Sequence, residues 1–252
     1  MTVDEPTRRL EIPILESQRH IKNYIRVAVC EVRFPVVLEI EERCPPRFQK
    51  ALRKKYPGFG KGQGFNITDS GASLGGASYT MQSRDSAWTI TIAPNRLSLE
   101  TNAYSVFEDF EVRLTEVIEE AMPDLDTDFF TRIGLRYVNA VPLPTNEREA
   151  LIQWINPILA SPLSSNAFGT ISAFTCEIRG KSMAGNYTFR YGLPEGGIVK
   201  DKGPEFMLDF DHFEENVEAV ELINLTREFR KINYSFFRWA LGPAAEANLL
   251  VK

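Results

Sequence analysis

Apolar and charged side chains alternate in two segments that lie far apart in the chain. The first contains Cys30-Glu31-Val32-Arg33, and the second contains Cys176-Glu177-Ile178-Arg179. Because successive side chains of a strand point to opposite faces of a sheet, each segment predicts a strand with one buried face and one solvated face. The shared sequence predicts two related halves, although chance similarity between two half-buried strands would produce the same match.

Hydrophobic periodicity and turn residues divide the first part of the chain into further elements. The predicted elements are a strand over 26–34, a helix over 47–56, a Gly-rich loop over 57–64, strands over 77–83, 88–93 and 96–102, a helix from about 105, and a strand over 129–141. Ser105 and Glu108 have the spacing of a capping box, and Pro123 is expected to stop that helix. Its apolar residues recur on one face: Phe107, Phe110, Leu114, Val117, Ile118 and Ala121.

The second part of the chain repeats this order. A helix over 147–159 precedes strands over 171–179, 187–192 and 206–211, and a long amphipathic helix over 217–241 ends before Gly242-Pro243. Pro142-Leu143-Pro144 marks the expected join, so the predicted halves are residues 1–144 and 145–252, which could also form a single compact domain. Strands in runs followed by a helix favour an α+β fold. We expect each half to be a mostly antiparallel sheet packed on one long amphipathic helix, with one continuous pseudo-symmetric sheet as a further possibility.

Composition places the chain among ordinary globular proteins. Hydrophobic residues make up 43% and charged residues 25% of its 252 residues, and the net charge of −5 argues against a whole surface that binds nucleic acid. The three cysteines include no C-x-x-C motif, which favours a reducing compartment. The polar first residues do not resemble a signal peptide, and no apolar run has transmembrane length. We therefore expect a cytoplasmic protein without a membrane partner.

Charged side chains on the solvated faces of the predicted strands form the candidate binding site. Arginine suits phosphate and carboxylate groups because its planar guanidinium donates two parallel hydrogen bonds. The alternative is that these residues only pair with one another on an ordinary solvated face. The predicted ligand-binding residues are Glu31, Arg33, Arg132, Arg136, Glu177, Arg179, Arg190, Asp209 and Asp211.

A basic segment stands out in this acidic chain. Seven basic residues and no acidic residue lie between Arg43 and Lys61, with aromatic residues among them. Such a segment could contact nucleic acid through phosphates and stacked bases, or it could simply be a solvated helix and loop. The candidate nucleic-acid contacts are Arg47, Lys50, Arg53, Lys54, Lys55 and Lys61.

Catalytic motifs find little support in the sequence. Residues 71–75 match G-x-S-x-G, but the required strand before the serine and helix after it are not predicted. With only two histidines, a metal site built on several histidines is excluded. Asp209 and Asp211, joined by Glu31 or Glu177, could hold Mg²⁺ through carboxylates. We assign no catalytic residue, metal or cofactor, and enzymatic activity is less expected than binding.

Four segments resemble a family of bacterial proteins of about this length that is sporadically distributed and has no assigned function. They are residues 29–35, residues 97–101 with 107–110, residues 130–139, and residues 208–211. The resemblance implies a bacterial cytoplasmic protein, and the distribution suits an accessory of a defence or mobile-element system. We therefore expect a non-enzymatic interaction protein that binds a protein partner or a small anionic ligand and that could form a homo-oligomer. The alternative is a Mg²⁺-dependent enzyme that acts on a nucleotide or nucleic acid.

Overall fold

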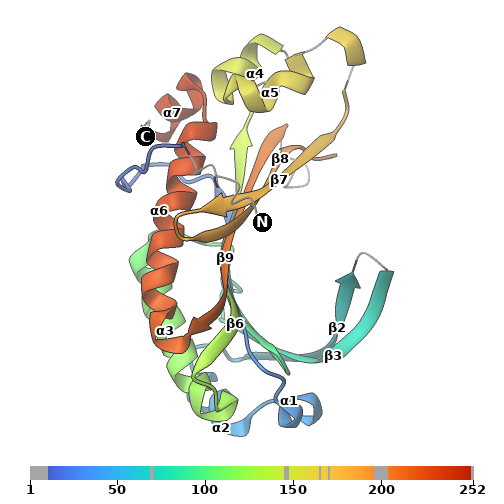
Figure 1. Ribbon diagram of the computed structural model, residues 1–252, viewed down its shortest axis with the longest axis vertical. Helices are drawn as coiled ribbons and strands as arrows, with labels where there is room; N and C mark the ends of the chain where they lie inside the picture. Colours follow the sequence, from blue (N-terminus) through green and yellow to red (C-terminus); the bar gives the residue numbers. More distant parts are fainter. Residues whose placement is uncertain are drawn as a thin grey trace, which may run out of the picture. The chain divides into compact units, whose positions relative to one another are not determined.

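The structure is a computed structural model that describes residues 11–68, 71–144, 148–164, 166–169, 171–195 and 204–250. It has an α+β fold, as expected, with a nine-stranded sheet in the order β2-β3-β4-β5-β1-β6-β9-β8-β7 (Figure 1). The strands are β1 (Ile25–Arg33), β2 (Gly58–Thr68), β3 (Gly71–Gln82), β4 (Trp88–Ala93), β5 (Arg96–Thr101), β6 (Phe129–Pro142), β7 (Phe174–Ser182), β8 (Gly185–Leu193) and β9 (Glu205–Glu218).

The α-helices are α1 (Leu38–Glu42), α2 (Pro46–Leu52), α3 (Phe107–Leu125), α4 (Arg148–Trp154), α5 (Pro157–Ser164), α6 (Leu222–Ala240) and α7 (Pro243–Leu250). Two short 3-10 helices, η1 (Asn166–Phe168) and η2 (Ala219–Glu221), complete the described elements. None of the helices in the described ranges is both long enough and apolar enough to span a membrane.

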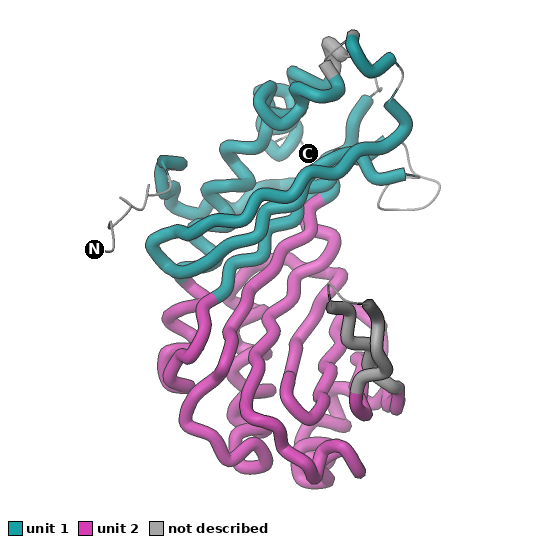
Figure 2. The backbone as a smooth tube through the Cα atoms, turned by 45° about the vertical axis from the view of Figure 1, so that its right-hand side comes forward, with its two compact units in different colours: residues 1–24, 140–213, 228–252 teal, residues 25–139, 214–227 magenta. Residues whose placement is uncertain are grey.

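The chain divides into two compact units, each assembled from separate stretches of sequence (Figure 2). Unit 1 comprises residues 1–24, 140–213 and 228–252, and unit 2 comprises residues 25–139 and 214–227. The expected boundary after residue 144 lies close to the change of unit at 139/140, but β9 and α6 also pass from one unit to the other. Neither unit is therefore a continuous half of the sequence.

In unit 2, helix α3 packs on the apolar face of the sheet. The expected alternation of β1 is confirmed, because Ala28, Cys30 and Val32 are buried while Arg33 is exposed. Phe110 of α3 is fully buried, and its ring centroid lies 5.8 Å from that of Trp88 on β4. Burial of one such side chain contributes about 1.5–3 kcal/mol. All six apolar residues that the sequence assigns to one face of this helix are buried.

Both predicted ends of α3 differ from the observed ones. The residue before the helix is Val106, with no side-chain capping bond, and the Ser105 hydroxyl instead lies 3.4 Å from Asp109 Oδ2. Pro123 is inside the last turn, and the helix continues to Leu125. Asp126 follows the last helical residue, and its φ of 46° is left-handed, a conformation that Asp tolerates better than most residues.

The prediction of a Gly-rich loop over 57–64 is wrong, because these residues belong mostly to strand β2 and pair with β3. At Gly60 a side chain would meet its register partner, since an added Cβ would lie 2.7 Å from Thr80 Oγ1. The glycines here permit close strand contact, and they do not signal a turn. Residues 71–75, the G-x-S-x-G match, also lie in a strand, so the strand–turn–helix context of a nucleophile elbow is missing.

In unit 1 the core is rich in aromatic residues from strands and α6. Phe189 of β8 and Phe210 of β9 stack with ring centroids 4.7 Å apart, and Phe236 of α6 contacts both rings. The predicted helix over 147–159 is two helices, because Asn156 accepts a bond from the Ile158 amide and Pro157 begins α5. The predicted long helix begins later than expected, since β9 extends to Glu218.

The two Cys-Glu-x-Arg segments are both strands, but they lie at different places in the sheet. Strand β1 pairs with β5 on one side and β6 on the other, whereas β7 is the last strand in the order and pairs with β8. The internal duplication therefore stays a prediction.

Candidate functional site

Three arginines form a row across the solvated face of the sheet in unit 2. Arg33, at the end of β1, is the register partner of Arg96 on β5 and of Arg132 on β6. Register partners in antiparallel strands point to the same face, and neighbouring strands are about 4.8 Å apart. The neighbours Val32, Leu97 and Ile133 are buried, so the three arginines lie on the opposite, solvated face. We call Arg96, Arg33 and Arg132 the arginine row.

The carboxylate of Glu31 contacts two of the three arginines in this row. The Arg33 Nε donates to Glu31 Oε1 at 2.8 Å, and Arg132 Nη1 lies 3.8 Å from the same oxygen. The Arg33 side chain is 52% exposed, and that of Arg132 only 16%. Arg96 is partly exposed and has no ion-pair partner in the part of the chain that the structure describes. Glu31 therefore offsets part of the positive charge of Arg33 and Arg132.

Gly134 allows Arg132 to lie flat against the sheet. Gly134 is the register partner of Glu31, and an added Cβ would lie 2.9 Å from the guanidinium carbon of Arg132. The Arg132 side chain thus extends along its own strand, from opposite Arg33 to opposite Glu31. Arg136, two positions further along β6, is exposed and pairs in register with Val29.

The other predicted ligand-binding residues lie in unit 1, in two rows across β7, β8 and β9. Arg190 is the register partner of Glu177 and of Asp209, and Thr188 is the partner of Arg179 and of Asp211. Arg190 Nε donates to Glu177 Oε2 at 2.6 Å, and its Nη1 lies 3.6 Å from Asp209 Oδ2. The row through Arg190 alternates in charge, which is the favourable arrangement for cross-strand neighbours, whereas in the other row the uncharged Thr188 separates Arg179 from Asp211.

Burial and charge act differently on the two carboxylates that contact Arg190. The Asp209 side chain is only 2% exposed, so it is a buried acid with a cationic neighbour. Partial desolvation opposes ionisation of Glu177, but Arg190 and Arg179 outweigh it and lower the pKa of that carboxyl. The charges of these five side chains on β7, β8 and β9 largely cancel, because three carboxylates face two guanidinium groups. This group has less excess positive charge to offer an anion than the arginine row has.

The basic segment is partly neutralised by the acidic face of α3, beside which α2 lies (Figure 1). Arg47 Nη1 donates to the Glu120 carbonyl at 2.8 Å and its Nη2 lies 3.4 Å from the Glu120 carboxylate, while Lys55 pairs with Glu116. Lys61 lies on β2, with its ammonium 5.5 Å from the ring centroid of Tyr79. The basic residues of the segment that are exposed and form no ion pair with the described residues are Arg43, Lys50, Arg53, Lys54 and Lys61. Contact of this segment with nucleic acid stays a prediction.

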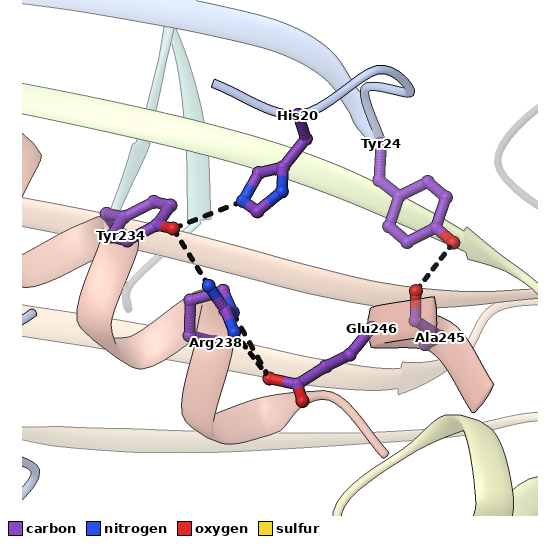
Figure 3. Close-up of polar contacts among 6 residues, drawn as sticks. All are labelled: His20, Tyr24, Tyr234, Arg238, Ala245 and Glu246. Carbon is purple, nitrogen blue, oxygen red and sulfur yellow. Dashed lines mark hydrogen bonds and ion pairs between the residues drawn. The ribbon is translucent and has the colours of Figure 1, made fainter. Parts of the chain in front are cut away.

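His20 anchors the N-terminal segment to α6 (Figure 3). Its Nε2 lies 3.1 Å from the Tyr234 hydroxyl, which also accepts a bond from Arg238 Nη1 at 3.0 Å. Arg238 in turn binds Glu246 of α7 at 3.0 Å. Burial first, and the positive charge of Arg238 second, lower the pKa of His20. The chain of contacts ties three separate segments of unit 1 together, so His20 has a structural role.

His212, on β9, is a buried core residue. Its side chain contacts the rings of Tyr187, Phe229 and Phe236, and its Nδ1 lies 2.6 Å from Asn233 Oδ1. An amide oxygen only accepts, so Nδ1 carries the proton and Nε2 is left without a partner in the described residues. Burial lowers the pKa of His212 to about 4. A neutral histidine among aromatic rings cannot reach a substrate in solvent.

The remaining catalytic options have no matching geometry in the described part of the chain. Within it, no group of three or more His, Cys, Asp or Glu side chains is placed to hold a metal ion. A ligand set for the suggested Mg²⁺ therefore cannot be named. Burial, and to a lesser extent Asp124, raises the pKa of Cys44 to about 11, so its thiol is not an activated nucleophile.

Arg96 is the site residue that sequence reasoning missed. Its place at the start of a strand was predicted, and the turn at Pro94-Asn95 fixes its register with β4. Its pairing with Arg33 joins residues 63 positions apart, and no local pattern encodes that pairing.

No protein-family model matches this chain, and a search of curated proteins found no match.

Proposed function

We propose that this chain is a non-enzymatic binding protein whose arginine row in unit 2 receives a small ligand with phosphate or carboxylate groups. The observation that carries this proposal is the register of Arg96, Arg33 and Arg132, which sets like charges directly opposite each other twice in succession. Such pairs destabilise a sheet by a few tenths of a kcal/mol up to about 1 kcal/mol each. Glu31 already offsets this repulsion between Arg33 and Arg132, so a bound anion would relieve chiefly the repulsion between Arg33 and Arg96.

The side-chain chemistry supports an oxyanion as the ligand. Each guanidinium presents several N–H groups in a plane, which matches the oxygen spacing of phosphate and carboxylate. The arginines follow one another at the strand spacing of about 4.8 Å, so adjacent guanidinium groups can reach the same ligand. Glu31 fixes the direction of Arg33 through a 2.8 Å bond and so reduces the entropy lost on binding. A compact ligand with two or more anionic groups fits this row best.

The test is the response of thermal stability to inorganic pyrophosphate. A ligand at 100 times its dissociation constant stabilises the folded state by about 2.7 kcal/mol, which raises the Tm of a domain of this size by roughly 5–10 °C. Arg96→Gln should remove most of this rise. It should also raise the Tm without ligand, because it removes one like-charge pair.

The matched control is Arg84→Gln, which removes an exposed arginine from the turn between β3 and β4 of the same unit. This variant should keep the full response to pyrophosphate. The proposal is refuted if Arg96→Gln and Arg84→Gln respond equally, or if pyrophosphate does not change the Tm of the unsubstituted chain at millimolar concentration.

A further inference from the structure

Strand β7 presents an open edge in unit 1. It is the last strand in the order, and within the described ranges it pairs only with β8 (Figure 1). Five of its nine side chains are exposed: Thr175, Glu177, Ile178, Arg179 and Lys181. The exposed backbone edge of a strand is a template for pairing with another strand.

The sequence of β7 is complementary to itself in the antiparallel direction. If two copies of β7 pair about a two-fold axis at Ile178, all nine residues overlap. Glu177 of each copy then lies opposite Arg179 of the other, which forms two symmetric pairs of opposite charge on one face of the sheet. The full set of opposed residues is Phe174 with Ser182, Thr175 with Lys181, Cys176 with Gly180, Glu177 with Arg179, and Ile178 with Ile178.

Other registers are less favourable. An axis at Gly180 would place Arg179 opposite Lys181, which is repulsive. An axis at Cys176 would pair only about half of the strand and place Glu177 opposite Thr175. A shift by a single residue would bring side chains of opposite faces together. The register with the longest overlap is thus also the one in which opposite charges meet.

We propose that β7 pairs antiparallel with β7 of a second copy of this chain, which forms a homodimer with a sheet continuous across both copies. Ile178 supports this choice of partner because it is 41% exposed and would pack against its own copy at the centre. The Arg179 side chain is 74% exposed and lies 2.7 Å from Glu177 of its own strand, so it is already next to the carboxylate that it would share between copies. The proposal is independent of the arginine row.

Charge reversal tests the register in solution. Arg179→Glu would set Glu177 opposite a glutamate in both pairs, and we expect its dimer dissociation constant, measured by sedimentation equilibrium, to rise at least tenfold. Glu177→Lys should weaken the dimer similarly, but a mixture of the two variants should form a heterodimer in which both pairs are again attractive. Arg84→Glu changes the charge of the chain equally and should leave the dimer intact.

Disulfide crosslinking tests which residues of the two β7 strands lie opposite each other. In a chain with Cys44→Ala and Cys176→Ala, oxidation of the Ile178→Cys variant should yield a covalent dimer, because opposed Cα atoms of paired strands are about 4.5–5.5 Å apart. Thr175→Cys should not, because its two copies would be six residues apart, roughly 20 Å. A chain that sediments as a monomer up to high micromolar concentration, or a dimer insensitive to both charge reversals, overturns the proposal. Equal crosslinking at 175 and 178 overturns the register.

Discussion

The buried imidazole of His212 should make the stability of this protein depend on pH in a window where few other groups titrate. In the folded state burial lowers its pKa to about 4, whereas an unfolded chain has the ordinary histidine value of about 6.5. The unfolded state therefore binds more protons between these values, and the free energy of unfolding falls as the pH is lowered through them. Above pH 7 both states are neutral and the full stability is present.

The size of this effect follows from the two pKa values. Their difference corresponds to about 3 kcal/mol once the pH is below both, and to about 2 kcal/mol between pH 8 and pH 5. With a urea m-value of about 2–3 kcal/mol/M, the midpoint of unfolding should fall by roughly 1 M over that range. Most carboxylates titrate at lower pH, so their contribution within this window is small.

Urea unfolding monitored by circular dichroism at pH 8, 7, 6 and 5 measures the slope. The chain has two histidines, so His20→Gln leaves His212 as the only one, and most of the pH dependence should remain in that variant. His212→Phe keeps the ring contacts with Phe229 and Phe236 while removing this titrating group, so its midpoint should depend much less on pH, with only the smaller contribution of His20 remaining. Its absolute stability should be lower, because Asn233 loses a donor. Equal slopes in the two variants would refute the assignment to His212.

Three further predictions concern packing and charge. Gly134→Ala should change the free energy of unfolding by less than about 1 kcal/mol, because only the flexible end of Arg132 has to move. It should still reduce the pyrophosphate-dependent rise in Tm. An unchanged rise would show that Gly134 is not part of the binding site. Phe110→Ala should cost about 3–5 kcal/mol in urea unfolding, and a loss under 1 kcal/mol would contradict its place in the core. Arg190→Gln should lower the free energy of unfolding by about 1–3 kcal/mol, because it removes a cation beside a buried aspartate. Arg179→Gln should change the free energy of unfolding by less than about 1 kcal/mol, because the Arg179 side chain is 74% exposed. A larger loss for Arg179→Gln than for Arg190→Gln would show that burial does not determine the loss of stability.

The sequence alone determined several of the strands and helices and the buried faces of β1 and α3, although it placed Asp209 on a solvated face and the structure buries it. The alternation around Cys30 predicted both the strand and the burial of Val32, and the spacing from Phe107 to Ala121 predicted the buried face of α3. Both depend on the local geometry of the backbone, which repeats every 2 or 3.6 residues and so is readable from neighbours in sequence. Predictions failed where a residue type that usually marks a turn is needed for packing instead. The glycines of β2 predicted a loop, but they allow this strand to lie close to β3.

Only the tertiary structure decided which polar side chains are neighbours. Strand order and register join residues that are far apart in the chain, and a register is fixed by the packing of whole strands, not by any one residue. The opposition of Arg96, Arg33 and Arg132 therefore became visible only in the folded sheet, as did the pairing of Lys55 with Glu116 that neutralises part of the basic segment. His212 illustrates the same limit, because the rings that enclose it come from strand β8 and helix α6, which lie apart from its own strand in the sequence.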